Sequence, residues 1–175
     1  TQVDIEMSFA DEDMIINMAE GLLAALLKDT LGVDIPLPMR RMTFDQAMAD
    51  YGVDKPDLRF DLKLKDVTDI VRGSEFKLFA TAPLVKAMRV PGGESLSRKE
   101  IDEFTEYVKI YGAKGLAWIK IRQAEQGAQP GHPVVEWQSP IAKFLSETER
   151  KGLVDALGLE EGDIVFFQAG EPSMV

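Results

Sequence analysis

Two carboxylates and an amide alternate with apolar residues in the stretch TQVDIEMSF at the start of the sequence. At a period of two residues, Gln2, Asp4 and Glu6 lie on one face of a predicted half-buried strand. Carboxylates two residues apart on one strand face project roughly 7 Å from each other. That spacing suits the binding of an ammonium group or a contribution to a Mg²⁺ site. The same pattern also fits an edge strand that its charges keep soluble.

The charge balance restricts any contact with nucleic acid. The formal net charge is -10, and a general phosphate-binding surface needs clustered Lys and Arg instead. The acidic segments EIDEFTE and EEGD repel phosphates. We therefore expect any RNA contact at a restricted patch around Lys114, Lys120 and Arg122.

Several kinds of site and compartment are disfavoured by composition. The sequence has no Cys and one His, which argues against disulfides and against thiolate or imidazole metal sites. His132 lies in the stretch QAEQGAQPGHP, a predicted surface loop, and PGGES is a predicted turn. No apolar run is long enough for a membrane span, and no signal pattern is present. We expect a cytoplasmic protein without a metal site or a membrane contact, cut from a longer chain that continues before Thr1.

Helix-capping signals predict the main helices. Two of these signals are capping boxes, in which Ser is followed three residues later by Glu. Glycines then mark the predicted helix ends. The predicted helices follow Asp11, Thr43, Ser97 and Ser146, and they end before Gly32, Gly52, Gly112 and Gly158.

Apolar runs and alternating patterns predict the strands. The order in the second part of the chain is two strands, a helix, two strands, a helix and a strand. This order predicts an α+β fold with a mainly antiparallel sheet and two helices. The predicted strands after the first are DLRFDLKLKD, EFKLFA, LVKAMRV, LAWIKI, VVEW and DIVFFQ.

Four blocks of the sequence resemble bacterial-type aspartyl-tRNA synthetases, which are class II enzymes. In order, the blocks are TQVDIEMSF, RRMTFDQAMADYG with DKPDLRFDL, VPGGESLSRKEIDEFTEYVKIYGAKGLAWIKI, and SPIAKFLSE. Together they span almost the whole chain. The first block resembles the tail of motif 2 in the catalytic domain. A later region resembles the GAD domain, an insertion between motifs 2 and 3 that also occurs in an archaeal amidotransferase subunit.

The resemblance implies three parts. Residues 1–73 correspond to a partial catalytic-domain segment, residues 74–170 to the GAD insertion domain, and residues 171–175 to a linker that returns to the catalytic domain. We expect the middle part to fold as its own cooperative unit and the first part to be looser.

The resemblance also implies a substrate pocket. In the family, the carboxylate that corresponds to Asp4 binds the α-ammonium of the substrate aspartate. Gln2 corresponds to a neighbouring amide of that pocket, and Glu6 matches by position. The implied parent is a homodimeric aspartate–tRNA ligase that uses ATP and Mg²⁺ to form aspartyl-adenylate and then charges tRNA. The arginines of motifs 2 and 3 correspond to positions before Thr1 and beyond Val175, so this segment alone is expected to bind no ATP and to be inactive.

Two interpretations of the segment remain open. In the first, it is part of the synthetase, and its GAD region is an auxiliary module that faces tRNA or another domain. In the second, it is a free-standing GAD-type binding module that acts with tRNA or an amidotransferase partner. The motif 2 tail favours the first, because a dedicated binding module has no need of half an amino-acid pocket.

Overall fold

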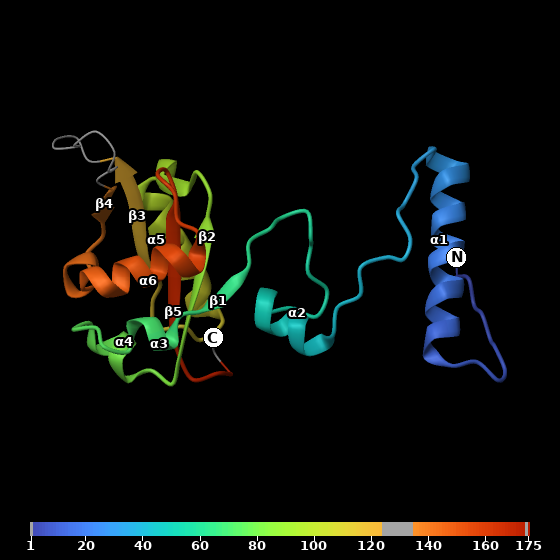
Figure 1. Cartoon of the computed structure of the whole chain (residues 1–175), viewed down its shortest axis with the longest axis horizontal. Coiled ribbons are helices and arrows are strands. Elements are labelled where there is room, and N and C mark those ends of the chain that lie inside the picture. Colours follow the sequence, from blue (N-terminus) through green and yellow to red (C-terminus); the bar gives the residue numbers. More distant parts are fainter. Residues whose placement is uncertain (1, 124–134, 174) are drawn as a thin grey trace. The chain divides into compact units, whose positions relative to one another are not determined.

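The chain forms two compact units in a computed structural model that describes residues 2–123, 135–173 and 175 (Figure 1). The N-terminal unit is Thr1–Thr43, and the sheet unit is Phe44–Val175. Each unit has its own secondary structure and is described by itself.

The N-terminal unit contains one long helix, α1 (Glu12–Leu31), with caps at both ends. The Asp11 carboxylate accepts a hydrogen bond from the Met14 N–H at 2.8 Å. At the other end, Gly32 has φ 68°, and its N–H donates to the Lys28 carbonyl at 3.0 Å. These local bonds satisfy backbone groups that helix termini otherwise leave unpaired. The helix predicted between Asp11 and Gly32 is confirmed.

The 175-residue chain does not form the strand predicted at residues 2–9. Residues 2–7 have no regular structure, and Phe9 has a positive φ of 57° with an exposed ring. Alternation places side chains on two faces, but a strand also needs a neighbouring strand for its N–H and C=O groups. Every strand found in the described residues lies in the sheet unit, and none of them pairs with this segment.

A single antiparallel sheet organises the second unit. Its order is β1-β2-β5-β3-β4, and all four neighbouring pairs are antiparallel. The longest ladder joins β2 to β5, from Leu84 opposite Gly170 to Val90 opposite Ile164. The predicted α+β fold with a mainly antiparallel sheet is confirmed. The strands are β1 (Leu64–Asp66), β2 (Leu84–Val90), β3 (Ala117–Gln123), β4 (Val135–Gln138) and β5 (Ile164–Gly170).

Helices cover both faces of this sheet (Figure 1). The larger buried cluster packs sheet residues such as Val85 and Phe167 against Phe79 and Leu153. On the opposite face, Ile101 packs against Ile164 and Phe166. The helical segments of the unit are α2 (Phe44–Tyr51), α3 (Thr68–Val71), α4 (Lys77–Thr81), η1 (Gly93–Ser95), α5 (Arg98–Ile110), η2 (Ala142–Phe144) and α6 (Glu147–Leu157).

Both predicted capping boxes are confirmed, at the starts of α5 and α6. In the first, the Ser97 hydroxyl accepts from the Glu100 N–H at 3.2 Å, while the Glu100 carboxylate accepts from the Ser97 N–H at 2.7 Å. The N-terminal ends of α5 and α6 are thus determined by hydrogen bonds between residues three positions apart. Such local bonds can be recognised from the sequence.

The strand predicted at EFKLFA is wrong, because residues 77–81 form α4. The Ser74 hydroxyl accepts from the Phe76 N–H at 3.0 Å, and the Phe79 N–H donates to the Phe76 carbonyl at 2.9 Å. The two phenyl rings, three residues apart, meet edge to face at 4.9 Å. A short apolar run fits either a strand or a helix. Here the helix forms, and Phe76 and Phe79, three residues apart, pack on the same side of it. The predicted strand at 57–66 is similarly reduced to β1.

The predicted turn at PGGES contains two glycines with different constraints. Gly92 has φ 68°, a left-handed conformation that glycine adopts without strain. Gly93 is buried, and a Cβ at its position would lie 2.4 Å from Cγ2 of Ile164. The turn therefore brings its backbone directly against the start of β5.

Candidate functional site

Lys120 on β3 holds the segment before α5 in place. Its side chain is buried, with a relative exposure of 7%, and its ammonium donates to the carbonyls of Glu94, at 2.7 Å, and Leu96. Burial is the main cause that lowers the pKa of Lys120, and the nearby Arg122 charge lowers it further. Glu94 and Glu100 act in the opposite direction. The predicted RNA contact at Lys120 stays a prediction, and the described structure gives this ammonium two internal partners.

Arg122 lies two residues further along β3 and is partly exposed. Its Nε is 2.7 Å from a carboxylate oxygen of Glu94. Lys120 and Arg122 line a hollow of about 590 Å³ beside the start of α5, together with Arg98 and Trp118. The structure thus brings two of the three predicted basic residues together on one face of β3, where alternate side chains project.

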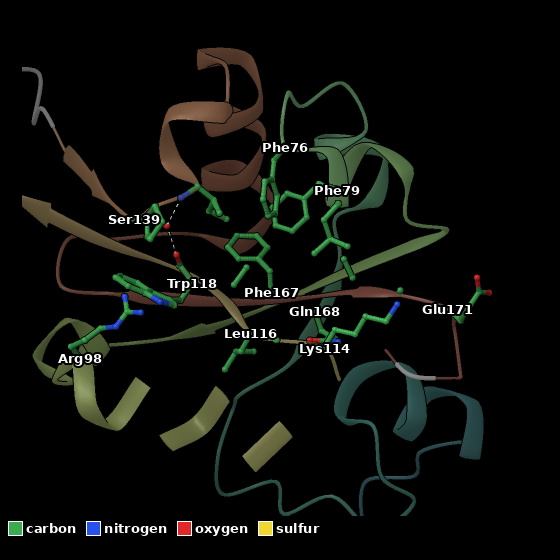
Figure 2. Close-up of a pocket in the computed structure, with 17 residues that line it drawn as sticks. Phe76, Phe79, Arg98, Lys114, Leu116, Trp118, Ser139, Phe167, Gln168 and Glu171 are labelled. Atoms are coloured by element: carbon green, nitrogen blue, oxygen red, sulfur yellow. Dashed lines mark hydrogen bonds between the residues drawn. The ribbon is translucent and has the colours of Figure 1, made fainter. Parts of the chain in front are cut away.

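The third predicted residue, Lys114, lines a different hollow of about 550 Å³. It makes no hydrogen bond or ion pair with any residue that the structure describes. Arg98 and Trp118 line both hollows, so the predicted basic patch extends over two neighbouring depressions of the sheet unit. Figure 2 shows the hollow that Lys114 lines, with Arg98 and Trp118 among its lining residues.

The sequence analysis named neither Arg98 nor Trp118 as a site residue. The Arg98 guanidinium lies 5.5 Å from the centroid of the Trp118 ring, within cation–π range. A signal was available: Arg98 is the first residue of a capped helix, and Trp118 shares its strand face with Lys120 and Arg122. What the sequence lacked was the packing of α5 across that face.

Gln2, Asp4 and Glu6 are all exposed and lie in a segment without regular structure. None of them lines either of the two hollows described above or forms an ion pair with another described residue. Their role as walls of an amino-acid pocket stays a prediction, because the strand that would align them is not formed here.

The described residues contain no group of three or more His, Asp or Glu side chains placed to hold a metal ion. Within the same ranges, no helix combines the length and the apolar character that a membrane crossing needs. His132 lies outside the described residues.

A five-stranded antiparallel sheet with helices on both faces defines this unit as an α+β module. Residues 78–175, more than half of the chain, match the GAD domain family, and the chain belongs to that family. The predicted resemblance is confirmed.

Three relatives that align with the whole chain are named as ligases. The chain is 73% identical, over all 175 residues, to an aspartate–tRNA(Asp/Asn) ligase of Nitratidesulfovibrio vulgaris, and it covers 27% of that protein. It is 66% identical to the enzyme of the same name from Oleidesulfovibrio alaskensis, again covering 27%. An aspartate–tRNA ligase of Macrococcus caseolyticus is 46% identical over 180 aligned residues, with 28% covered. The chain thus spans about a quarter of the length of these curated relatives.

Proposed function

We propose that this chain is a segment of an aspartate–tRNA ligase that carries its GAD domain. The observation that supports this most strongly is the 73% identity to such a ligase along all 175 residues. The parent enzyme would form aspartyl-adenylate from aspartate and ATP, with Mg²⁺, and pass the aspartyl group to tRNA. By its family resemblance the parent would be a cytoplasmic homodimer, and the 175-residue chain alone would be inactive.

The first residues would supply part of the aspartate pocket. Asp4 would bind the α-ammonium of aspartate, Gln2 would lie beside it, and Glu6 would lie on the same strand face. In support, these polar side chains are exposed, which leaves them available to a substrate. A neighbouring strand of the parent's catalytic sheet would give this segment the backbone partners that a strand requires.

The GAD domain would be an auxiliary module that faces tRNA. Lys114 and Arg122 are exposed or partly exposed and would contact phosphates, while buried Lys120 would position the segment before α5. The names of the two relatives at 73% and 66% identity support charging of both the aspartate and the asparagine tRNA.

Pyrophosphate exchange tests the ligase proposal. A gene product that contains this chain and extends to the length of its relatives should catalyse aspartate-dependent exchange between ATP and pyrophosphate. It should also aspartylate both tRNAs. The 175-residue chain should do neither, because the cations that stabilise charge at the α-phosphate would come from elsewhere in the enzyme. Exchange by the chain alone, or none by the longer protein, would contradict the proposal.

Substitution of single cations tests the tRNA-facing role in the same enzyme. Arg122→Gln should raise KM for tRNA and reduce the slope of log K against log salt by about 1, while KM for aspartate stays constant. Lys151→Gln is the matched control, since Lys151 is an exposed cation on α6 that pairs with Asp155. Equal tRNA affinity in both variants would remove Arg122 from the interface.

A further inference from the structure

The cations beside the start of α5 already have partners within the chain. Arg122 Nε lies 2.7 Å from a carboxylate oxygen of Glu94, and Arg98 Nε lies 2.9 Å from one of Asp102. The third cation that lines this hollow, Lys120, donates to two backbone carbonyls. A phosphate that approaches the hollow therefore meets cations that are already bound to internal partners.

The backbone of Glu94 is fixed on both sides of its side chain. Its N–H donates to the Gly162 carbonyl at 2.9 Å, and its carbonyl accepts from the Lys120 ammonium at 2.7 Å. Gly162 also donates its N–H to the carbonyl of Ile121, the neighbour of Arg122, at 2.8 Å. One turn residue thus ties Glu94 to the strand that carries Arg122. Because the backbone is already ordered, the carboxylate loses little freedom when it pairs with the guanidinium.

The contact between Glu94 and Arg122 is an ion pair that an external anion can replace. The two side chains are 34% and 38% exposed, respectively. Arg122 Nε makes no hydrogen bond with a described residue, so charge alone joins the two groups. Ion pairs of this exposure contribute little to stability. A phosphate offers a guanidinium two parallel, charge-assisted hydrogen bonds, which favours the exchange.

The position of a second acid separates this contact from general repulsion. Glu136 is exposed and lies opposite Arg122 in the β3–β4 ladder, but it forms no ion pair with a residue that the structure describes. Glu94 is in direct contact with the guanidinium. A phosphate that binds Arg122 must therefore break the contact with Glu94, whereas it only approaches Glu136.

We propose that Glu94 competes with RNA phosphate for Arg122 and so limits the affinity of this face of the GAD domain for RNA. The inference rests on the proposed tRNA contact at Arg122. In the free protein, Glu94 holds the guanidinium in place and neutralises its charge. In the complex, the phosphate replaces the carboxylate, and Glu94 returns to water. Glu94 thus determines the strength of the contact although it does not itself bind the RNA.

A double-mutant cycle in the longer enzyme tests this competition. Glu94→Gln removes the charge with little change in size and should tighten the binding of aspartate tRNA about threefold at about 0.1 M salt. Glu103→Gln is the matched control, because it changes the net charge equally and removes an exposed acid that pairs with Lys99. In the Arg122→Gln background, Glu94→Gln should tighten binding no more than the control does. Fluorescence anisotropy of labelled tRNA measures each Kd.

The outcomes separate this inference from the proposed function. Equal gains from Glu94→Gln with and without Arg122 would show general repulsion and overturn the competition. So would a gain no larger than that of Glu103→Gln while Arg122→Gln still weakens binding, and in that case the tRNA contact itself would stand. Unchanged affinity in every variant, Arg122→Gln included, would overturn both the tRNA contact and the competition.

Spectra of the 175-residue chain test the ion pair without any RNA. In ¹H–¹⁵N spectra, Glu94→Gln should shift the Nε–H resonance of Arg122, whereas Glu103→Gln should leave it in place. Thermal stability should change little, because the backbone bonds of Glu94 to Gly162 and Lys120 remain. An Arg122 resonance that does not respond to Glu94→Gln would show that the pair is not formed and would overturn the proposal.

Discussion

The two units of the chain differ in how much apolar surface they bury. In α1 the side chain that is buried is an acid, Glu20, while Leu22 and Leu26 are about half exposed. In the sheet unit, Phe79 and Val85 are fully buried, and the exposed face of α6 carries charges. The ends of a helix are thus marked by local caps, whereas a core requires several elements to converge.

Polar contacts link distant residues of the N-terminal unit. Arg41 reaches back to α1, where its guanidinium donates to Asp13 at 2.7 Å and to Asn17 at 3.2 Å, and lies 3.8 Å from Glu20. Exposed ion pairs of this kind contribute little to stability. The difference between the units predicts that truncation of a core side chain in the sheet unit costs more folding stability than truncation of a half-exposed side chain in α1.

The largest expected effect is the loss of a core ring. Phe79→Ala should lower the free energy of unfolding of the 175-residue chain by about 3–5 kcal/mol, since it leaves a cavity between Phe76 and Phe167. Leu26→Ala, in half-exposed surroundings, should change it by no more than about 0.5 kcal/mol. Urea unfolding measures both. Similar losses in the two variants would abolish the contrast between the units.

The second expected effect lies in the N-terminal unit and concerns activity. In the longer enzyme, Asp4→Asn should leave a substrate ammonium without its partner, a penalty of about 2–5 kcal/mol. The kcat/KM for aspartate should fall about 30-fold or more, with little change in ATP affinity or thermal stability. Steady-state kinetics check this. A decrease below about threefold would assign the ammonium to another residue.

A buried hydroxyl provides the third test. Thr68 accepts from the Val85 N–H at 2.8 Å and donates to the Asp66 carboxylate at 2.6 Å. Thr68→Val keeps the shape of the side chain but removes the acceptor of the buried Val85 N–H. This unpaired N–H should lower the free energy of unfolding by about 1–3 kcal/mol. Thr68→Ser retains the hydroxyl and should be milder. Equal destabilisation by both variants would indicate lost packing instead of a lost hydrogen bond.

The smallest expected effect depends on pH. The Thr68 hydroxyl, followed by the Thr68 N–H and the charges of Lys86 and Arg72, lowers the pKa of Asp66 against the opposing effect of burial. A carboxylate whose folded pKa is depressed stabilises the protein above its unfolded pKa of about 3.9, and this contribution disappears as pH falls through the folded pKa. The stability difference between the native chain and Asp66→Asn should therefore narrow below about pH 4. A difference that stays constant from pH 7 to pH 3 would contradict this account.

The elements that could be predicted from the sequence are those with local determinants. Asp11, Ser97 and Ser146 act through bonds to residues three positions away, so their helices were predicted correctly. Residues 2–9 and 84–90 both show strand patterns, but only the second segment has neighbouring strands on both sides. Strand formation depends on these distant partners, which a pattern within one segment does not contain.

The candidate site was predictable only in part for the same reason. The sequence analysis grouped Lys120 and Arg122 in one patch, and in the structure both line one hollow. The sequence did not show that the Lys120 ammonium turns inward to two carbonyls, or that Lys114 lines a separate hollow. Both facts follow from how α4 and α5 pack against the sheet.

The turn before α5 has a consequence for the range of sequences that this fold accepts. Because a Cβ at position 93 would overlap Cγ2 of Ile164 at 2.4 Å, a library that samples every amino acid there should return glycine in nearly all folded clones. At position 92, a Cβ would meet no atom within 4 Å and only the left-handed conformation matters, so asparagine should be recovered as well. Two consecutive glycines in such a loop can therefore be retained because of packing at Gly93 and backbone conformation at Gly92. Their retention does not require a bound phosphate.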